Sequence, residues 1–274
     1  MLDPGLYVVA TPIGNLEDIS YRAVRILGEA NCIAAEDTRH SRILLNHFGI
    51  DTSMISLHEH NEDAQLTGLI SRIRAGEAIA LISDAGTPLI SDPGFKLVRA
   101  LAAEGLPVFS VPGPSAVTAA LSIAGIASDR FRFEGFLAAK SSARIKQLES
   151  LRNEKATLVF FESSHRIEAS ISDMLNVFGA DREAAICREL TKRFETVLRG
   201  SLGELQEKLG SDGDQRRGEF VVLVSGSSEQ GTPVDGLELA TALRDYLSAS
   251  QAARVASKIT GSSRRRIFDA LKDS

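Results

Sequence analysis

The stretch Leu6-Tyr7-Val8-Val9-Ala10-Thr11-Pro12-Ile13-Gly14-Asn15 decides the fold class, because an apolar run passes directly into a loop of small residues. The same arrangement returns twice: Ala78–Ile82 precedes the loop at 83–88, and Val108–Val111 precedes the loop at 112–116. One such loop is usually only a turn. In a parallel α/β sheet, however, ligands bind beyond the carboxyl ends of the strands. Three loops of this kind in one half of the chain therefore predict a single composite ligand site.

Strand-like and helix-like segments alternate through the first half of the chain. This alternation favours right-handed crossovers and a mostly parallel sheet, so we expect a Rossmann-like α/β domain over residues 1–113. The expected strands are 6–10, 32–35, 54–57, 78–82 and 108–111, and the expected helices are 19–27, 39–48, 63–74 and 95–103.

The pattern is looser after the third loop, and it predicts a second α/β domain with a mixed sheet over residues 114–225. The domain boundary is expected near residues 112–115. The expected strands are 131–136, 157–161, 184–188, 196–198 and 220–224, and the expected helices are 119–125, 143–151 and 165–178.

A Gly/Ser/Pro-rich stretch, SGSSEQGTPVD at 225–235, indicates a linker, which we place at 226–236. Beyond it, a helix at 237–248 and an apolar face at Ala252, Val255, Ala256 and Ile259 predict a helix-turn-helix-like tail over 237–274. Gly261 is expected to end its middle helix, and Ser262 or Ser263 to cap the last one. The tail holds seven Lys/Arg and four Asp/Glu, so it carries +3 within a chain of net charge −5.

Composition restricts the function classes. No run of eighteen apolar residues is present, and the first strand begins so early that we expect neither a membrane span nor a signal peptide. Cys32 and Cys187 lie far apart in apolar runs, which indicates two buried thiols in a reducing compartment, the cytoplasm. Aromatic residues make up 5% and tryptophan is absent, so the sequence shows no stacking platform for single-stranded nucleic acid.

Several familiar motifs are absent or incomplete. No Gly-x-Gly-x-x-Gly follows a strand, and no Gly-Lys-Ser/Thr is present. Ser115 lacks the second glycine of a nucleophile elbow, so we interpret it as a hydrogen-bond donor to a ligand or as a helix cap. His58-Glu59-His60 would place both imidazoles on one face if the preceding strand continued, but no third metal ligand is evident, and a loop near the ligand cleft is the simpler interpretation.

Two polar segments follow predicted strands. Ser163-Ser164-His165 is expected to start a helix as a polar cap rather than to form part of a catalytic triad. In Glu36-Asp37-Thr38-Arg39, two acids and an arginine stand on the edge where the glycine loops gather. The simpler alternative is that Asp37 or Thr38 caps the next helix and that Glu36 is solvated.

The chain resembles the tetrapyrrole methylase family over essentially its whole length, including the basic tail. The resemblance is carried by six motifs in register: ATPIGNL at 10–16, AEDTR at 35–39, SDAGTP at 83–88, DPG at 92–94, VPGPSA at 111–116 and FESSHR at 161–166. It implies a cleft between two α/β domains that binds S-adenosylmethionine. The match is close to one branch of the family, whose members methylate the ribose 2′-hydroxyl of a cytidine in the decoding region of 16S ribosomal RNA. The small ribosomal subunit is the implied partner, and a homodimer the implied assembly.

The resemblance also implies the cofactor contacts. They are Pro12, Ile13, Gly14, Thr87, Ile90, Ser115, Ala116, Phe161 and Phe220. The second loop departs from the family pattern Gly-Asp-Pro, since Thr87 places a hydroxyl where a carboxylate is usual.

A methyl group on a sulfonium is already activated, so the expected mechanism needs no metal. A ribose hydroxyl is a poor nucleophile near neutral pH, and a positioned general base speeds such a reaction by about 10²–10⁴-fold. Asp92 and Asp37 are the candidates. Arg39, Arg42 and Arg264-Arg265-Arg266 are assigned to RNA phosphates, the alternative being an ordinary solvated surface.

Two other functions stay open. A tetrapyrrole C-methyltransferase would share the fold, but a macrocycle has no phosphate backbone for a basic tail to bind. A non-catalytic protein that binds RNA or the ribosome would share the charge pattern without transferring a methyl group.

Overall fold

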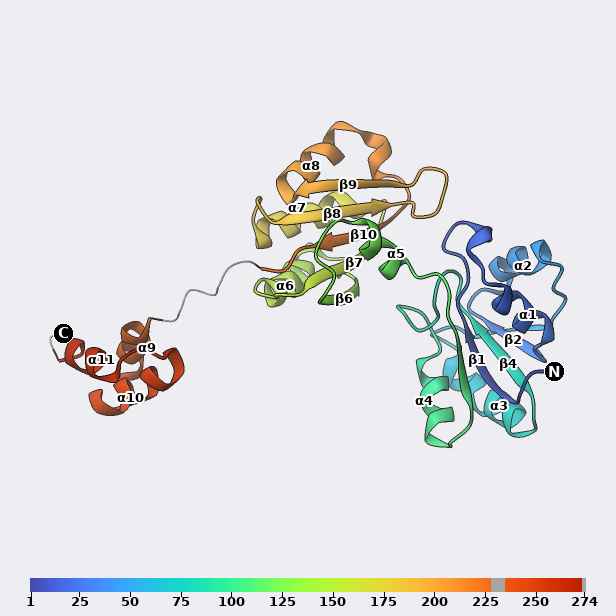
Figure 1. Cartoon of the computed structure of the whole chain (residues 1–274), viewed down its shortest axis with the longest axis horizontal. Helices are drawn as coiled ribbons and strands as arrows, with labels where there is room; N and C mark the ends of the chain where they lie inside the picture. Colours follow the sequence, from blue (N-terminus) through green and yellow to red (C-terminus); the bar gives the residue numbers. More distant parts are fainter. Residues whose placement is uncertain (228–234, 273–274) are drawn as a thin grey trace. The chain divides into compact units, whose positions relative to one another are not determined.

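The computed structural model describes residues 1–227 and 235–272. It divides into two compact units, one made of Met1–Arg152 with Ala156–Ser225, the other of Asn153–Lys155 with the chain from Gly226 onward (Figure 1). None of the described helices is both long and apolar enough to cross a membrane.

The first sheet is entirely parallel, with strand order β3-β2-β4-β1-β5. Its strands are β1 (Gly5–Val9), β2 (Cys32–Ala35), β3 (Met54–Ser56), β4 (Ala78–Ile82) and β5 (Val108–Val111), and its helices are α1 (Tyr21–Glu29), α2 (Thr38–His47), α3 (Glu62–Arg74) and α4 (Phe95–Ala103). Successive residues of these strands point to opposite faces of the sheet and pack in two separate apolar clusters. One is shared with α1 and α2, the other with α3 and α4. The sheet is therefore covered on both faces, which confirms the predicted fold class.

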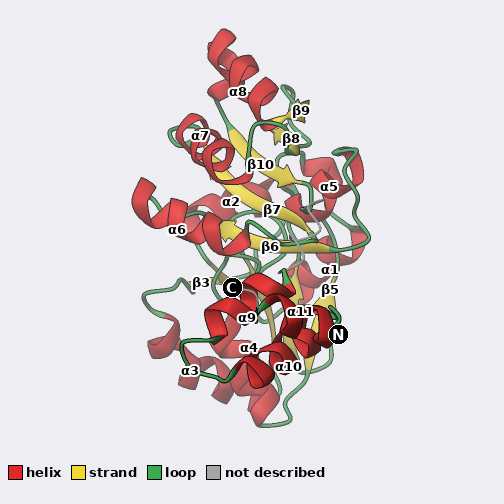
Figure 2. Ribbon diagram, turned by 90° about the vertical axis from the view of Figure 1, so that its left-hand side faces the viewer, coloured by secondary structure: helices red, strands yellow, loops and turns green. Residues whose placement is uncertain are grey.

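The second sheet is mixed, with strand order β6-β7-β10-β8-β9. Only β6 and β7 run parallel, and the other pairs are antiparallel. The strands are β6 (Phe131–Phe136), β7 (Thr157–Ser163), β8 (Glu183–Arg188), β9 (Thr196–Ser201) and β10 (Glu219–Val224). Helices α6 (Ser141–Leu151) and α7 (Ile167–Phe178) pack on one face, and α5 (Ala116–Ile123) packs on the other (Figure 2).

One helix was not expected from the sequence. α8 (Leu202–Ser211) follows β9, and it begins with a capping box in which Ser201 and Glu204 exchange hydrogen bonds. Its inner face is buried through Leu202, Leu205 and Leu209. The sequence therefore contains leucines at helical spacing in this segment. The two glycines within the segment obscured this spacing, because glycine disfavours helix interiors.

Strand β3 ends at Ser56, so His58 and His60 lie beyond it in a loop, in agreement with the simpler interpretation. Two other local expectations were wrong. Ser163 is the last residue of β7 and Ser164 and His165 lie in the following turn, because helix α7 begins only at Ile167. Helix α5 begins at Ala116, immediately after the third loop, rather than at residue 119.

The described part of the terminal unit holds three short helices, α9 (Gly236–Leu243), α10 (Ala249–Thr260) and α11 (Arg264–Ala270). The helix expected over 237–248 is shorter, because Ser248 instead forms a capping box with Gln251 and begins α10. Gly261 ends α10 in a left-handed conformation, as predicted. Ile259 is 66% exposed rather than part of the apolar face.

Small and aliphatic side chains form the core of this unit. They are Ala240, Ala252, Ala253, Ala256, Ile267 and Leu271. Most of the expected linker at 226–236, namely 228–234, lies outside the described residues, as do the last two residues of the expected tail.

Candidate functional site

The three glycine/proline loops meet at the carboxyl edge of the first sheet. Thr11 and Gly86 form an antiparallel bridge, with N–H to O distances of 2.9 and 3.0 Å, which joins the first loop to the second. The Thr87 hydroxyl donates to the carbonyl oxygen of Pro114 at 3.0 Å, which joins the second loop to the third. The predicted composite arrangement is therefore present, and the hydroxyl that replaces the usual carboxylate connects two of its loops.

Gly86 permits this close approach. Its φ is +81°, and a Cβ atom there would lie 3.3 Å from Cγ2 of Ile13. Any larger side chain would combine an unfavourable backbone conformation with a crowded contact. The small residue expected at this loop is thus required by the backbone conformation and by the close contact with Ile13.

A cavity of about 550 Å³, called here the main cavity, opens where these loops face the second sheet. Seven of the nine expected cofactor residues line it: Ile13, Thr87, Ile90, Ser115, Ala116, Phe161 and Phe220. Pro12 and Gly14 do not, and they line a smaller neighbouring hollow on the other side of the first loop. The Ser115 hydroxyl makes no capping hydrogen bond, although the residue stands at the start of α5.

Backbone strain is concentrated in the cavity wall. Among the described residues, the non-glycine residues with positive φ are Leu89 (74°), Ser91 (68°), Glu189 (51°) and Thr191 (64°). They flank the cavity residues Ile90 and Leu190. Each such conformation costs about 1–3 kcal/mol and is typical of functional sites.

Three carboxylates from two strand ends line the cavity. The backbone N–H of Asp37 donates to Asp84 at 3.0 Å, and that of Asp84 donates to Glu36 at 3.3 Å, which connects the loops after β2 and β4. Burial raises the pKa of Asp92 from an ordinary 3.8 to about 6, a hydrogen bond with Ser83 opposes this, and Glu36 and Asp84 add to it. Burial also raises the pKa of Glu36. The wall therefore favours a cationic ligand.

Asp37 has a different environment from Asp92. It caps α2 by accepting from the Arg39 N–H at 2.8 Å, and it also pairs with the Arg39 guanidinium at 3.1 Å. These contacts with Arg39 hold the pKa of Asp37 down at about 2. Asp37 is not among the residues that line the main cavity. Asp37 therefore caps helix α2, as the simpler alternative proposed. Glu36, which that alternative placed in bulk solvent, lies in the cavity wall instead.

Sequence reasoning missed several residues of the cavity wall, among them Phe136, Cys187, Leu190 and Lys192. The Lys192 ammonium bonds to Glu189 at 2.9 Å and to Glu219 at 2.7 Å. Cys187 and Cys32 are both buried free thiols, as predicted, and burial raises the pKa of Cys187 to about 11. Cys187, Leu190 and Lys192 lie in a stretch without glycine or proline, so no local sequence signal marks them.

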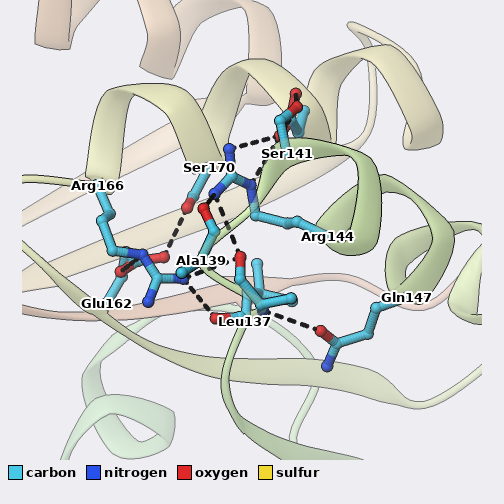
Figure 3. A network of polar contacts seen from close by, with 10 residues as sticks. Leu137, Ala139, Ser141, Arg144, Gln147, Glu162, Arg166 and Ser170 are labelled. Atoms are coloured by element: carbon cyan, nitrogen blue, oxygen red, sulfur yellow. Dashed lines mark hydrogen bonds and ion pairs between the residues drawn. The ribbon is translucent and has the colours of Figure 1, made fainter.

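A buried polar network supports the wall contributed by the second sheet (Figure 3). Glu162, which lines the cavity, accepts from the Ser170 hydroxyl at 2.5 Å and pairs with Arg166 at 3.3 Å. Arg166 in turn donates to the carbonyl oxygen of Leu137, just after β6. These bonds fix the loop that follows Phe136 against β7 and α7.

The network continues into an ion pair with almost no solvent exposure. The Arg144 guanidinium contacts the Asp173 carboxylate at 2.6 and 2.7 Å, and Ser141 donates to the same carboxylate at 3.0 Å (Figure 3). Arg144 also donates to the carbonyl oxygens of Ala138 and Ala139. Helices α6 and α7 are thereby joined beside the cavity wall.

The arginines assigned to RNA lie on exposed surfaces. Arg39 and Arg42 project from α2, with the Arg39 side chain 91% exposed. In the terminal unit, Arg264, Arg265 and Arg266 open α11 and are exposed, and Arg264 donates to the Ser250 hydroxyl at 3.2 Å.

Residues 5–206 match the family model described as Tetrapyrrole (Corrin/Porphyrin) Methylases. The chain belongs to the tetrapyrrole methylase family. Within this family it is similar to a Xylella fastidiosa protein named ribosomal RNA small subunit methyltransferase I, with 51% identity over 98% of this chain and 99% of the relative. A protein of the same name from Escherichia coli O157:H7 is 44% identical over 96% of this chain and 93% of the relative.

Solved structures of other proteins share the fold. Uroporphyrin-III C-methyltransferase from Thermus thermophilus, in complex with S-adenyl homocysteine, superposes with a TM-score of 0.57 at 20% identity, covering 80% of this chain and 96% of that one. A diphthine synthase superposes with a TM-score of 0.60 at 16% identity, covering 80% and 89%. At these identities, the likeness concerns the fold alone.

Proposed function

We propose that this protein is an S-adenosylmethionine-dependent methyltransferase that acts on ribosomal RNA of the small subunit. The observation that carries the proposal is the joining of the three loops around one acidic cavity, in a chain that matches the named rRNA methyltransferases over nearly its full length. The solved relative with S-adenyl homocysteine supports the same cofactor.

The residues of the main cavity fit this methyl donor. Glu36, Asp84 and Asp92 supply negative charge for a cation, while Ile13 and Phe161 supply apolar surface of the kind that binds an adenine ring. When bound, the donor supplies a methyl group activated by a positively charged sulfur. The loops hold the reactants in line and exclude water, a contribution that reaches about 7–11 kcal/mol in well-oriented reactions.

The proposed acceptor is the ribose 2′-hydroxyl of a cytidine in the decoding region. Asp92 is the proposed general base, since it borders the cavity and its pKa of about 6 leaves it mostly ionised yet basic at neutral pH. Asp92 takes up the proton that the hydroxyl loses as its oxygen gains the methyl group. Asp37, with its capping bonds and its pKa of about 2, is a much weaker base.

The proposal also covers the roles of the domains, the RNA contacts, the location and the assembly. Two α/β domains, the first ending near residue 113, would form the catalytic body, and the terminal helices an RNA-binding module. Arg39, Arg42 and the α11 arginines would contact RNA phosphates. Exposed cationic side chains that neutralise phosphates release the counterions bound to the nucleic acid, and this release favours binding. A ribosomal substrate places the activity in the cytoplasm, and we propose a homodimer as the working assembly.

Three measurements test this function. Calorimetry should detect binding of S-adenosylmethionine, and labelled donor should transfer its methyl group to small subunits from cells that lack the protein. Mass spectrometry should then locate one new ribose methyl group on a cytidine of 16S RNA. Tight donor binding without transfer would favour a non-catalytic RNA-binding protein, and transfer to a tetrapyrrole carbon would favour a C-methyltransferase.

A further inference from the structure

A second depression, called here the side hollow, lies beside the main cavity and has a volume of about 290 Å³. It is formed by the first loop from Thr11 to Gly14, the helix α2 and the start of the loop after β4. Ile13, Asp84 and Lys192 line both spaces. A group held in the side hollow therefore lies next to whatever occupies the main cavity.

One buried polar group in this hollow has no partner in the described part of the chain. Ser41, on α2, is 3% exposed, and its hydroxyl makes no hydrogen bond there. Buried hydroxyls are almost always hydrogen-bonded, and a helical serine commonly donates to the carbonyl one turn earlier. Ser41 is also one of the residues that line the side hollow, so this unsatisfied hydroxyl belongs to the wall of the hollow.

The other walls are mainly apolar. Pro12, Leu16 and Leu44 line the hollow, and so does Ile43, which is 67% exposed. A large apolar side chain with this exposure is suited to contact with a flat ring. Apolar walls with a few polar groups are typical of pockets that hold a base taken out of an RNA or DNA stack.

Volume restricts the ligand further. A space of about 290 Å³ is at the lower limit for a small-molecule site. It is suited to a single nucleoside and is too small for a tetrapyrrole macrocycle. His40 lines the same hollow and is exposed, and Arg39 and Arg42 are exposed residues of the same helix α2.

We propose that the side hollow binds the acceptor nucleoside, extruded from its RNA strand. The base contacts Ile43 and Leu44, the Ser41 hydroxyl bonds to a polar edge of the base, and the ribose faces the shared wall at Ile13 and Asp84. This inference rests on the proposed function, and it adds which surface of the protein selects the RNA substrate.

The test uses full-length protein and small ribosomal subunits that lack the methyl group. Ser41→Ala removes the unpaired hydroxyl, Ile43→Asp places a charge on the apolar rim, and Asn46→Ala is a control on an exposed position of the same helix that does not line the hollow. For each variant we would measure kcat and KM for the RNA substrate, donor affinity by calorimetry, and stability in urea.

Loss of one substrate hydrogen bond should lower kcat/KM for RNA by about tenfold in Ser41→Ala. Ile43→Asp should lower it at least as much, with the change mainly in KM. Donor affinity should not change in either variant, and Ser41→Ala should be as stable as the wild type or more so. The Asn46→Ala control should match the wild type in every measurement.

Two results would overturn the inference while leaving the proposed function intact. Equal RNA kinetics in all variants would mean that the hollow is not used, and a parallel loss of donor affinity would make it part of the cofactor site. If the wild-type protein bound the donor but transferred no methyl group to RNA, the proposed function would fail, and the acceptor role of the hollow with it.

Discussion

Replacing Asp92 with asparagine should stabilise the folded protein at neutral pH while removing the proposed base. Burial raises the pKa of Asp92 from 3.8 to about 6. Between these values the folded protein binds more protons than the unfolded chain, so stability falls as pH rises through this window. At pH 7.5 the ionised carboxylate therefore opposes folding, and the uncharged amide of asparagine does not.

The two pKa values limit the effect. Each tenfold change in acidity corresponds to about 1.4 kcal/mol, so the upper bound at pH 7.5 is about 3 kcal/mol. Asp92 is only partly buried, and solvent screening reduces the expected gain to about 1–2 kcal/mol. About half of this gain should remain at pH 5, and almost none below about pH 3.5.

Urea unfolding at pH 7.5 and pH 5.0 measures the stability of wild type, Asp92→Asn and the control Asp51→Asn, an exposed aspartate outside the cavity. Methyl transfer by Asp92→Asn should fall by about 10²–10⁴-fold, and the wild-type rate should rise with pH through about 6. A variant that is less stable than wild type at pH 7.5, or equally shifted at both pH values, would refute the electrostatic argument. Full activity in Asp92→Asn would refute the assignment of the base.

Three further outcomes follow from contacts in the structure. Thr87→Val removes the bond to the Pro114 carbonyl and should weaken donor binding in calorimetry by about fivefold, the equivalent of about 1 kcal/mol. Arg144→Met leaves the Asp173 carboxylate buried without its partner and should cost about 3–5 kcal/mol in urea unfolding, much of which Arg144→Met/Asp173→Leu should restore. Replacing all of Arg264–Arg266 with alanine should reduce the slope of log RNA affinity against log salt by about 2–3, while donor affinity stays the same.

Matched variants separate these effects from general damage. Thr52→Val loses a similar hydroxyl bond, 2.7 Å to the Leu27 carbonyl, and should leave donor affinity unchanged. Arg74→Met breaks the solvent-exposed pair with Glu104 and should cost less than about 1 kcal/mol. Equal donor affinity in Thr87→Val and wild type, or an unchanged salt dependence in the tail variant, would rule out the corresponding role.

The first half of the site was predictable because its signals are local. Each strand of a parallel sheet delivers its following loop to the same edge, so the loops at Ile13, Thr87 and Ser115 had to gather. The residues of the first loop that reach the main cavity were not predictable: Ile13 lines both spaces, whereas Pro12 and Gly14 line only the side hollow. The loop sequence alone does not determine this division.

The second half of the site depends on long-range pairing. Phe161 and Phe220 line the cavity as the resemblance implied, and their strands are paired, with Phe220 opposite Glu162. Leu190 and Lys192 reach the cavity through a strained turn after β8 that carries no glycine or proline. Their position is set by the register of β8 against β10, which the sequence of either strand does not specify.

The burial of Cys187 bears on a side reaction of the proposed chemistry. Cys187 lines the cavity that would hold an electrophilic methyl group, and thiolates are better nucleophiles than ribose hydroxyls. With a pKa of about 11, the side chain stays a neutral thiol at physiological pH. With the proposed methyl donor in the main cavity, a more acidic cysteine at this position would compete with the intended acceptor for the methyl group.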